Sequence, residues 1–175
     1  MRLFHVSEET DIVEFVPRFR SKYSKHDMDK GLVWAINERC LPNFLTPRDC
    51  PRVTYHAHED TTNDDILKFF SSSSRHCVAI ESAWYERMKK TTLYLYEFNP
   101  TNFCKQNDGA GYYVSEQTEQ HISVTKIDNL FGELFKRNVE VRILNNLWQL
   151  GEAVKESTLN WSLCRMINAQ PKLTE

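Results

Sequence analysis

The segment Thr92–Phe98, with the sequence TLYLYEF, has the clearest periodicity in the chain. Leu93 and Leu95 alternate in it with Tyr94, Tyr96 and Phe98. Because successive side chains of a β-strand point to opposite faces, this period of two predicts a strand that is apolar on both faces. The fold is therefore expected to contain a sheet with this segment inside it.

Further strands are predicted from short apolar or alternating runs on either side of this segment. They cover residues 3–7, 32–36, 77–80, 111–115, 122–127 and 139–143. Helices are predicted at 66–70, 84–89, 130–135 and 147–154, the first preceded by Thr62 as a cap and the third by Asp128. Strands and helices mix without regular β-α-β spacing, so the predicted fold class is α+β rather than a doubly wound sheet.

Three segments lack a regular pattern. Residues 20–30 have almost no apolar content and are predicted to form a mixed-charge loop. Pro42, Pro47 and Pro51 fix three φ angles and remove three donors, so their segment is predicted to be irregular. Residues 159–167 do not distinguish a helix from a strand.

Length and charge limit the classes of function. The chain has 175 residues, and we expect one domain over residues 1–175. With 22 Lys and Arg against 24 Asp and Glu, its net charge of −2 provides no general cationic field for duplex nucleic acid or anionic lipid. The longest segment without a charged residue, 143–151, is about half as long as a transmembrane helix. Glu8 interrupts the N-terminus before an apolar segment can form, so we expect a cytoplasmic protein without a secretory signal or membrane partner.

Cysteine and glycine patterns exclude further classes. The five cysteines are widely spread and form no C-x-x-C pair, which predicts reduced and mostly buried thiols. Neither G-x-x-x-x-G-K-[ST] nor G-x-G-x-x-G occurs, and the lone Gly109-Ala110-Gly111 is not a phosphate cradle by itself. Walker-type nucleotide hydrolases and ordinary dinucleotide-fold dehydrogenases are therefore disfavoured.

Several short motifs resemble those of a group of short, uncharacterised bacterial proteins. The shared motifs are HVSE at 5–8, PRDCPRV at 47–53, GYYVS at 111–115, NLW at 146–148 and a terminal R-x-x-N-A-x-P at 165–171. This resemblance covers nearly the full length and brings no activity with it.

A second resemblance covers roughly the first two thirds of the chain. LFHVS at 3–7, FVPR at 15–18, VWA at 33–35, LYLYEF at 93–98 and YYVS at 112–115 together resemble ADP-ribosyltransferase-like proteins. The resemblance implies a split mixed or antiparallel sheet with flanking helices, and NAD as the substrate that provides ADP-ribose.

The same resemblance implies roles for particular residues. His5 and Ser7 match the motif that holds the ribose and nicotinamide of NAD, and two residues so spaced on a strand point to one face. Trp34 matches the aromatic residue of the second strand, Tyr113 would stack on a ring, and Arg18 would neutralise the pyrophosphate. The first strand and the loops around Trp34 and Tyr113 would form the cleft for the nucleotide.

The acidic residue of the motif does not match. The strand at 112–115 has no carboxylate where related proteins often have one, and the nearest are Glu116 and Glu119. Glu116 is the candidate acid, because developing oxocarbenium charge needs a carboxylate. The predicted function is transfer of ADP-ribose to an unspecified acceptor or cleavage of NAD. The alternative is a non-catalytic nucleotide-binding or interaction module that keeps the fold and the cleft but lacks the carboxylate.

Two other clusters offer different chemistry. His56 and His58 lie two residues apart and would be the first ligands of a metal-dependent hydrolase, although a polar loop explains them better. Cys50 lies between Arg48 and Arg52, a setting that would lower a thiol pKa, although these arginines equally suit bonds to loop carbonyls. No metal is expected.

Overall fold

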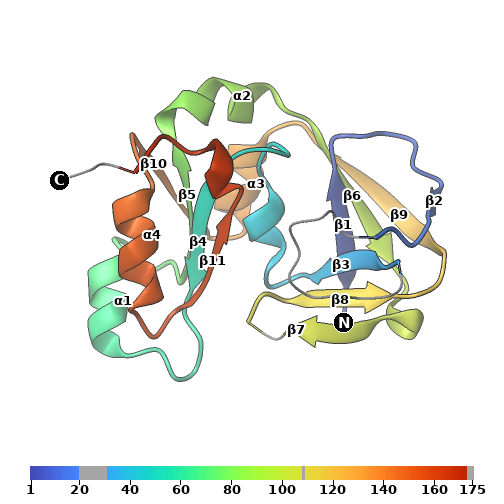
Figure 1. Ribbon diagram of the computed structural model, residues 1–175, viewed down its shortest axis with the longest axis horizontal. Helices are drawn as coiled ribbons and strands as arrows, with labels where there is room; N and C mark the ends of the chain where they lie inside the picture. The colour runs from blue at the N-terminus through green and yellow to red at the C-terminus, as the bar shows by residue number, and fades with distance from the viewer. Residues whose placement is uncertain (20–30, 108, 173–175) are drawn as a thin grey trace. The chain divides into compact units, whose positions relative to one another are not determined.

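The computed structural model describes residues 1–19, 31–107 and 109–172, so the loop predicted at 20–30 lies outside the described residues. The α+β class is confirmed (Figure 1). The chain divides into two compact units: unit 1 is Met1–Leu41 with Leu93–Ile127, and unit 2 is Pro42–Thr92 with Asp128–Glu175. Each unit is described by itself, and the expectation of one domain stays a prediction.

Unit 1 contains a seven-stranded sheet in the order β2-β9-β6-β1-β3-β8-β7, in which all neighbours are antiparallel. Its strands are β1 (Leu3–Ser7), β2 (Glu14–Phe15), β3 (Val33–Asn37), β6 (Leu93–Phe98), β7 (Cys104–Asn107), β8 (Tyr112–Ser115) and β9 (Glu119–Ile127). The strands predicted around 3–7, 32–36, 92–98, 111–115 and 122–127 are therefore confirmed, while β7 was not predicted.

One face of this sheet carries an aromatic and aliphatic core. Its buried members are Leu3, Phe15, Val33, Ala35, Tyr96, Phe98 and Phe103. The register aligns His5 with Tyr96 and Ser7 with Tyr94 across β1 and β6, so these four side chains share that face. We call it the His5 face. The period of two in β6 places Tyr94, Tyr96 and Phe98 on this face, where they pack beside the residues of β1.

Strand β1 is paired unequally on its two sides. Its five residues all pair with β6, but only Leu3 and Phe4 pair with β3. The aligned pairs of β1 with β3 thus end at Phe4, one residue before His5.

Unit 2 contains a four-stranded mixed sheet in the order β10-β5-β4-β11, with β10 parallel to β5 and the other pairs antiparallel. The strands are β4 (Arg52–His56), β5 (His76–Glu81), β10 (Glu140–Leu144) and β11 (Asn160–Cys164). The strands predicted at 77–80 and 139–143 are confirmed as β5 and β10. The segment 159–167, for which the sequence did not distinguish a helix from a strand, contains strand β11. The prediction of a polar loop at 56–60 and an irregular segment through Arg52 missed β4.

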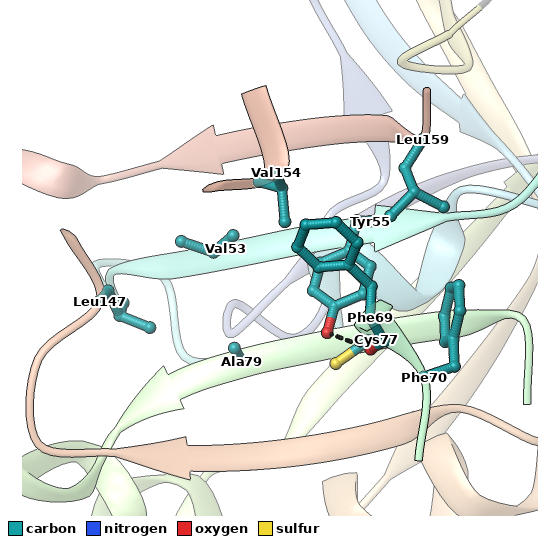
Figure 2. Packing of buried hydrophobic residues seen from close by; sticks show 9 residues of the cluster. All are labelled: Val53, Tyr55, Phe69, Phe70, Cys77, Ala79, Leu147, Val154 and Leu159. Carbon is teal, nitrogen blue, oxygen red and sulfur yellow. Dashed lines mark hydrogen bonds between the residues drawn. The ribbon is translucent and has the colours of Figure 1, made fainter. Parts of the chain in front are cut away.

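The missed strand lies in the centre of unit 2. Val53 and Tyr55 of β4 pack into a core with Phe69, Phe70, Cys77, Ala79, Leu147, Val154 and Leu159 (Figure 2). Within it the Tyr55 hydroxyl donates to the Phe69 carbonyl at 3.0 Å. The other side of β4 carries Arg52, Thr54 and His56, all buried, so its sequence lacks the expected apolar pattern.

The helices of unit 2 are short. They are α1 (Asn63–Phe69), α2 (Tyr85–Lys90), α3 (Leu130–Lys136) and α4 (Trp148–Lys155), with 3-10 turns at Leu41–Phe44, Ser82–Trp84, Pro100–Asn102 and Met166–Asn168 elsewhere in the chain. Thr62 caps α1 as predicted, by accepting from the Asp65 N–H. The predicted cap Asp128 is wrong for α3, because the Asn129 side chain accepts from the Gly132 N–H instead. In the described part of the chain, no helix has the length and apolar character needed to cross a bilayer.

The C-terminal segment is fastened to unit 2 by polar contacts. Both carboxylate oxygens of buried Glu81 accept from the Gln170 N–H, at 3.1 and 3.0 Å, and the Trp148 indole donates to the Gln170 carbonyl at 2.8 Å. The Asn168 side chain donates to the Asp49 carbonyl at 2.8 Å. The terminal R-x-x-N-A-x-P motif is therefore held against unit 2 at Asn168 and Gln170.

Glu140 makes part of the stability of unit 2 depend on pH. Burial by itself would raise the pKa of this carboxyl, but hydrogen bonds from the Arg142 side chain and the Ser71 N–H outweigh burial and lower it. A carboxyl whose pKa is lowered by folding stabilises the fold above its unfolded pKa, and the contribution is lost as the pH falls through the folded value. Glu140→Gln should therefore flatten the fall in free energy of unfolding below about pH 4.3.

Urea denaturation at a series of pH values measures this effect. The exposed Glu156→Gln is the matched control and should follow the wild type. A Glu140→Gln protein that loses stability in acid as steeply as the wild type would contradict the assignment.

Candidate functional site

His5 lies where the ladder between β1 and β3 ends. Its ring is half-buried, 4.9 Å from the Phe15 ring, and its Nδ1 is 3.2 Å from the Trp34 carbonyl oxygen. Because a carbonyl only accepts, Nδ1 carries the proton, and in the neutral ring Nε2 then carries the lone pair. A side-chain hydrogen bond thus joins β1 to β3 next to their last aligned pair, Phe4 and Ile36.

Ser7 ends β1 on the same face as His5. Its hydroxyl oxygen accepts from the Glu9 N–H at 3.0 Å, which forms a tight turn at the start of the following loop. The pair predicted to hold a ribose is therefore present on one strand and one face.

Trp34 and Tyr113 lie on opposite faces of the sheet. Tyr113 is aligned with Ala35, a member of the core on the His5 face, while Trp34 is aligned with Val114. The Trp34 ring meets Tyr112 edge to face at 5.5 Å. The structure brings Tyr113 to the face of His5 and Ser7, and it places the Trp34 ring on the other side.

Arg18 is exposed, and its backbone forms a two-way bridge with Leu32. The Arg18 N–H donates to the Leu32 carbonyl at 3.1 Å, and the Leu32 N–H donates back at 3.0 Å. The backbone position of Arg18 is thus fixed beside β3, while the described contacts do not tie its guanidinium to the His5 face.

The two candidate acids differ in their surroundings. Glu116 is exposed in the turn after β8. Glu119, the first residue of β9, is only 6% exposed and accepts from the Ser115 hydroxyl at 2.5 Å. Of the two, only Glu119 is held inside unit 1.

Glu119 is linked to His5 through one side chain. Phe15 of β2 is aligned with Glu119 across the sheet, and the Phe15 ring contacts the His5 ring. Ser115, which holds the carboxylate, is aligned with Val33 of the core on the His5 face. Sequence reasoning chose Glu116 because it is nearer to the strand. The sequence feature that could have pointed to Glu119 is its spacing of four residues from Ser115 across a tight turn.

A hollow of about 380 Å³ lies beside these residues on β6 and β9. It is lined by Thr10, Asp11, Ile12, Val13, Tyr94, Tyr96, His121, Val124 and Lys126. The register aligns Tyr94 with Ser7 and with Lys126, so the hollow opens on the His5 face. We call it the β6–β9 hollow. Sequence reasoning missed it because the loop that encloses it has no periodic pattern.

The wall of the hollow is fixed by Tyr96. Its hydroxyl donates to the Glu9 carbonyl at 2.8 Å and accepts from the Ile12 N–H at 3.3 Å, which holds the loop over the sheet. Asp11 in this loop has a φ of 61°, a conformation that Asp tolerates better than most residues. The His121 ring lies 5.3 Å from the Tyr96 ring, and its buried Nδ1 has no hydrogen-bond partner among the described residues. The hollow therefore combines aromatic, basic and acidic groups.

Cys50 does not have the environment of a reactive thiol. It is fully buried, and this burial raises the pKa of the thiol to about 12, against the lowering expected from its arginine neighbours. The Arg52 guanidinium instead donates to the carbonyls of Asn43, at 2.6 Å, and Cys50, at 3.1 Å. The alternative prediction, that arginine holds this loop through its carbonyls, is confirmed for Arg52.

The two histidines of the proposed metal site have other surroundings. His56 is buried in β4 with its ring 5.1 Å from that of His76, while the Nε2 of His58 lies 2.8 Å from the Thr158 carbonyl oxygen. Within residues 1–19, 31–107 and 109–172, no three His, Cys, Asp or Glu side chains are grouped closely enough to hold a metal ion. These histidines therefore supply no metal site from the described residues.

Comparison with known proteins places the chain in a family. Residues 4–169 match the model of a family described as "Family of unknown function (DUF6886)", and the chain belongs to it. The resemblance to an uncharacterised family is thereby confirmed. No curated protein and no solved structure matches the chain, so the resemblance to ADP-ribosyltransferase-like proteins stays a prediction.

The cysteines give a direct test of the described burial. Cys40, Cys50 and Cys77 are buried, Cys164 is half-buried and Cys104 is exposed, and all five are free. A thiol reagent should therefore modify Cys104 fastest in the native protein, because access and thiolate fraction both set the rate. Cys104→Ser should remove the fastest phase in a colorimetric thiol assay, and Cys50→Ser should leave it. A fast phase that disappears with Cys50 would contradict its burial.

Proposed function

We propose that unit 1 binds NAD along the His5 face and breaks the bond between nicotinamide and ribose, with an acceptor hydroxyl or water taking the ADP-ribose. The observation that carries this proposal is the buried carboxylate of Glu119, which is linked through Phe15 to the His5 ring. A histidine, a serine and a buried acid on one face supply the groups that this chemistry needs.

His5 and Ser7 are suited to hold a ribose. They lie on one face at the end of β1, and both are half-buried, so part of each side chain is accessible to a ligand. The Nε2 of neutral His5 accepts from a sugar hydroxyl, and the Ser7 hydroxyl donates to a sugar oxygen. Tyr113 on the same face offers a ring for the nicotinamide.

Glu119 takes the role first assigned to Glu116. As the C–N bond breaks, its electron pair leaves with the nicotinamide ring, and the ribose carbon acquires oxocarbenium character. A fixed carboxylate stabilises that positive charge, and the Ser115 hydroxyl holds the carboxylate in place. The acceptor oxygen then forms the new bond to the ribose carbon and releases its proton.

The β6–β9 hollow fits one part of the dinucleotide rather than the whole. Its volume of about 380 Å³ is near the lower end for ligand pockets, which run from about 300 to 1,000 Å³. The Tyr94 ring lies across from Ser7 and suits stacking on a base, and Lys126 beside Tyr94 supplies a positive charge toward phosphate. We assign the adenine end of NAD to this hollow.

One observation favours a second candidate, nucleotide binding without catalysis. The Glu119 carboxylate already accepts a hydrogen bond from Ser115 and is buried, which also suits a purely structural acid. In that case NAD binds on the His5 face and stays intact. Nicotinamide release separates the two candidates.

The proposal is tested by calorimetric titration of NAD with chromatography of nicotinamide in the same samples. Glu119→Gln keeps the shape and the bond to Ser115 but removes the charge, so it should slow release by about 10²- to 10³-fold with little change in affinity. Glu116→Gln is the matched control and should release nicotinamide at the wild-type rate. His5→Ala should weaken NAD binding about tenfold through the loss of one hydrogen bond.

Each result has one interpretation. Equal release by the wild type and Glu119→Gln would overturn the catalytic role of Glu119. Binding without release in the wild type would establish the non-catalytic alternative, and absence of NAD binding would overturn both. Thermal unfolding of each variant confirms that the comparison is made between folded proteins.

A further inference from the structure

We propose that unit 2 binds single-stranded nucleic acid on an aromatic row formed by α2 and α3. The row consists of Tyr85, Phe131 and Phe135. The Tyr85 and Phe131 ring centroids are 5.6 Å apart, and those of Phe131 and Phe135 are 6.4 Å apart with nearly parallel planes. This surface is separate from the His5 face, and its binding does not depend on the proposed cleavage of NAD.

These rings are not needed to anchor their helices. Met88 holds α2, and Leu130 and Leu134 hold α3, each at most 1% exposed. Phe135 nevertheless leaves 61% of its surface exposed and Tyr85 leaves 39%. Exposed aromatic rings that contact one another are unusual on a surface that has no partner, and they mark a binding site.

The charge around the row favours a polyanion. The segments Tyr85–Lys90 and Leu130–Arg137 contain the five cations Arg87, Lys89, Lys90, Lys136 and Arg137 against the two acids Glu86 and Glu133. Their net charge is +3, whereas the whole chain carries −2, so the remainder carries −5. Positive charge is therefore concentrated on the helices that present the rings.

The cations lie close to aromatic rings. The Lys89 ammonium lies 5.1 Å from the Tyr85 ring centroid, and the Arg87 guanidinium lies 5.0 Å from the Trp84 ring centroid. Rings on which bases stack, beside cations that contact phosphates, are the usual elements of a site for single strands. A duplex hides the faces of its bases, so the row discriminates against it.

A single strand fits this surface better than a membrane does. Helices that lie in a bilayer surface present a wide apolar face, whereas the exposed large apolar side chains of α2 and α3 are Tyr85 and Phe135. Glu86 and Glu133 lie on these same helices, where they pair with Lys89 at 3.1 Å and with Arg137 at 3.0 Å. A nucleic acid strand contacts the rings and cations locally.

The test measures fluorescence anisotropy of labelled 12-nucleotide oligo-uridine and oligo-thymidine without NAD. Phe135→Ala should weaken binding about 5- to 150-fold, because a stacked base contributes about 1 to 3 kcal/mol. Leu67→Ala, at an exposed apolar position on α1, is the control and should bind like the wild type. A preference for one oligonucleotide would identify RNA or DNA as the ligand.

Salt dependence provides a second readout. Lys90→Gln should reduce the slope of log affinity against log salt by about 0.7, the value for one phosphate contact on a single strand. Lys155→Gln on α4 should leave the slope unchanged. No oligonucleotide binding at 50 mM salt, or equal affinity for a duplex of the same length, would overturn the proposal. So would binding to phosphatidylserine vesicles that Phe135→Ala abolishes while oligonucleotides remain unbound.

Discussion

The end of the ladder between β1 and β3 is the constraint on which the arrangement of unit 1 depends. Strand β1 keeps all of its pairs with β6, so its course is fixed, yet its pairing with β3 stops at Phe4. Next to that last pair the His5 side chain joins the two strands through its hydrogen bond with the Trp34 carbonyl. The same residue carries the proposed contact with the ribose.

The aromatic core supports the residues around His5. Phe15 contacts the rings of His5, Tyr96 and Phe98, and Tyr96 in turn holds the loop over the β6–β9 hollow through its hydroxyl. Large rings that meet edge to face make a rigid support, because each is held by several neighbours. The candidate site is therefore built on strands and packed rings, and its one covering loop is tied at Glu9 and Ile12.

Sequence periodicity predicted the strands in which apolar residues alternate or form a continuous run. It failed at β4, where Arg52, Thr54 and His56 are buried and the side chains of Arg52 and Thr54 donate to backbone carbonyls inside unit 2, so the pattern of the strand looks like a loop. Periodicity also leaves the register between strands open. That register decides that Tyr113 shares a face with His5 while Trp34 does not, and that Phe15 is aligned with Glu119. The burial of Glu119 depends on a pairing between strands about a hundred residues apart.

Whole-chain composition conceals local differences in the same way. A net charge of −2 argues against a general attraction to nucleic acid, yet the sum contains a cationic pair of helices and a more acidic remainder. The distinction matters physically because screening confines the effect of a surface charge to about 8 Å at physiological salt. A strand lying on α2 and α3 experiences the charges within that distance, together with the rings, and the acidic residues farther away contribute little. The overall charge therefore limits long-range steering by the protein, while the local charge sets what the aromatic row can hold.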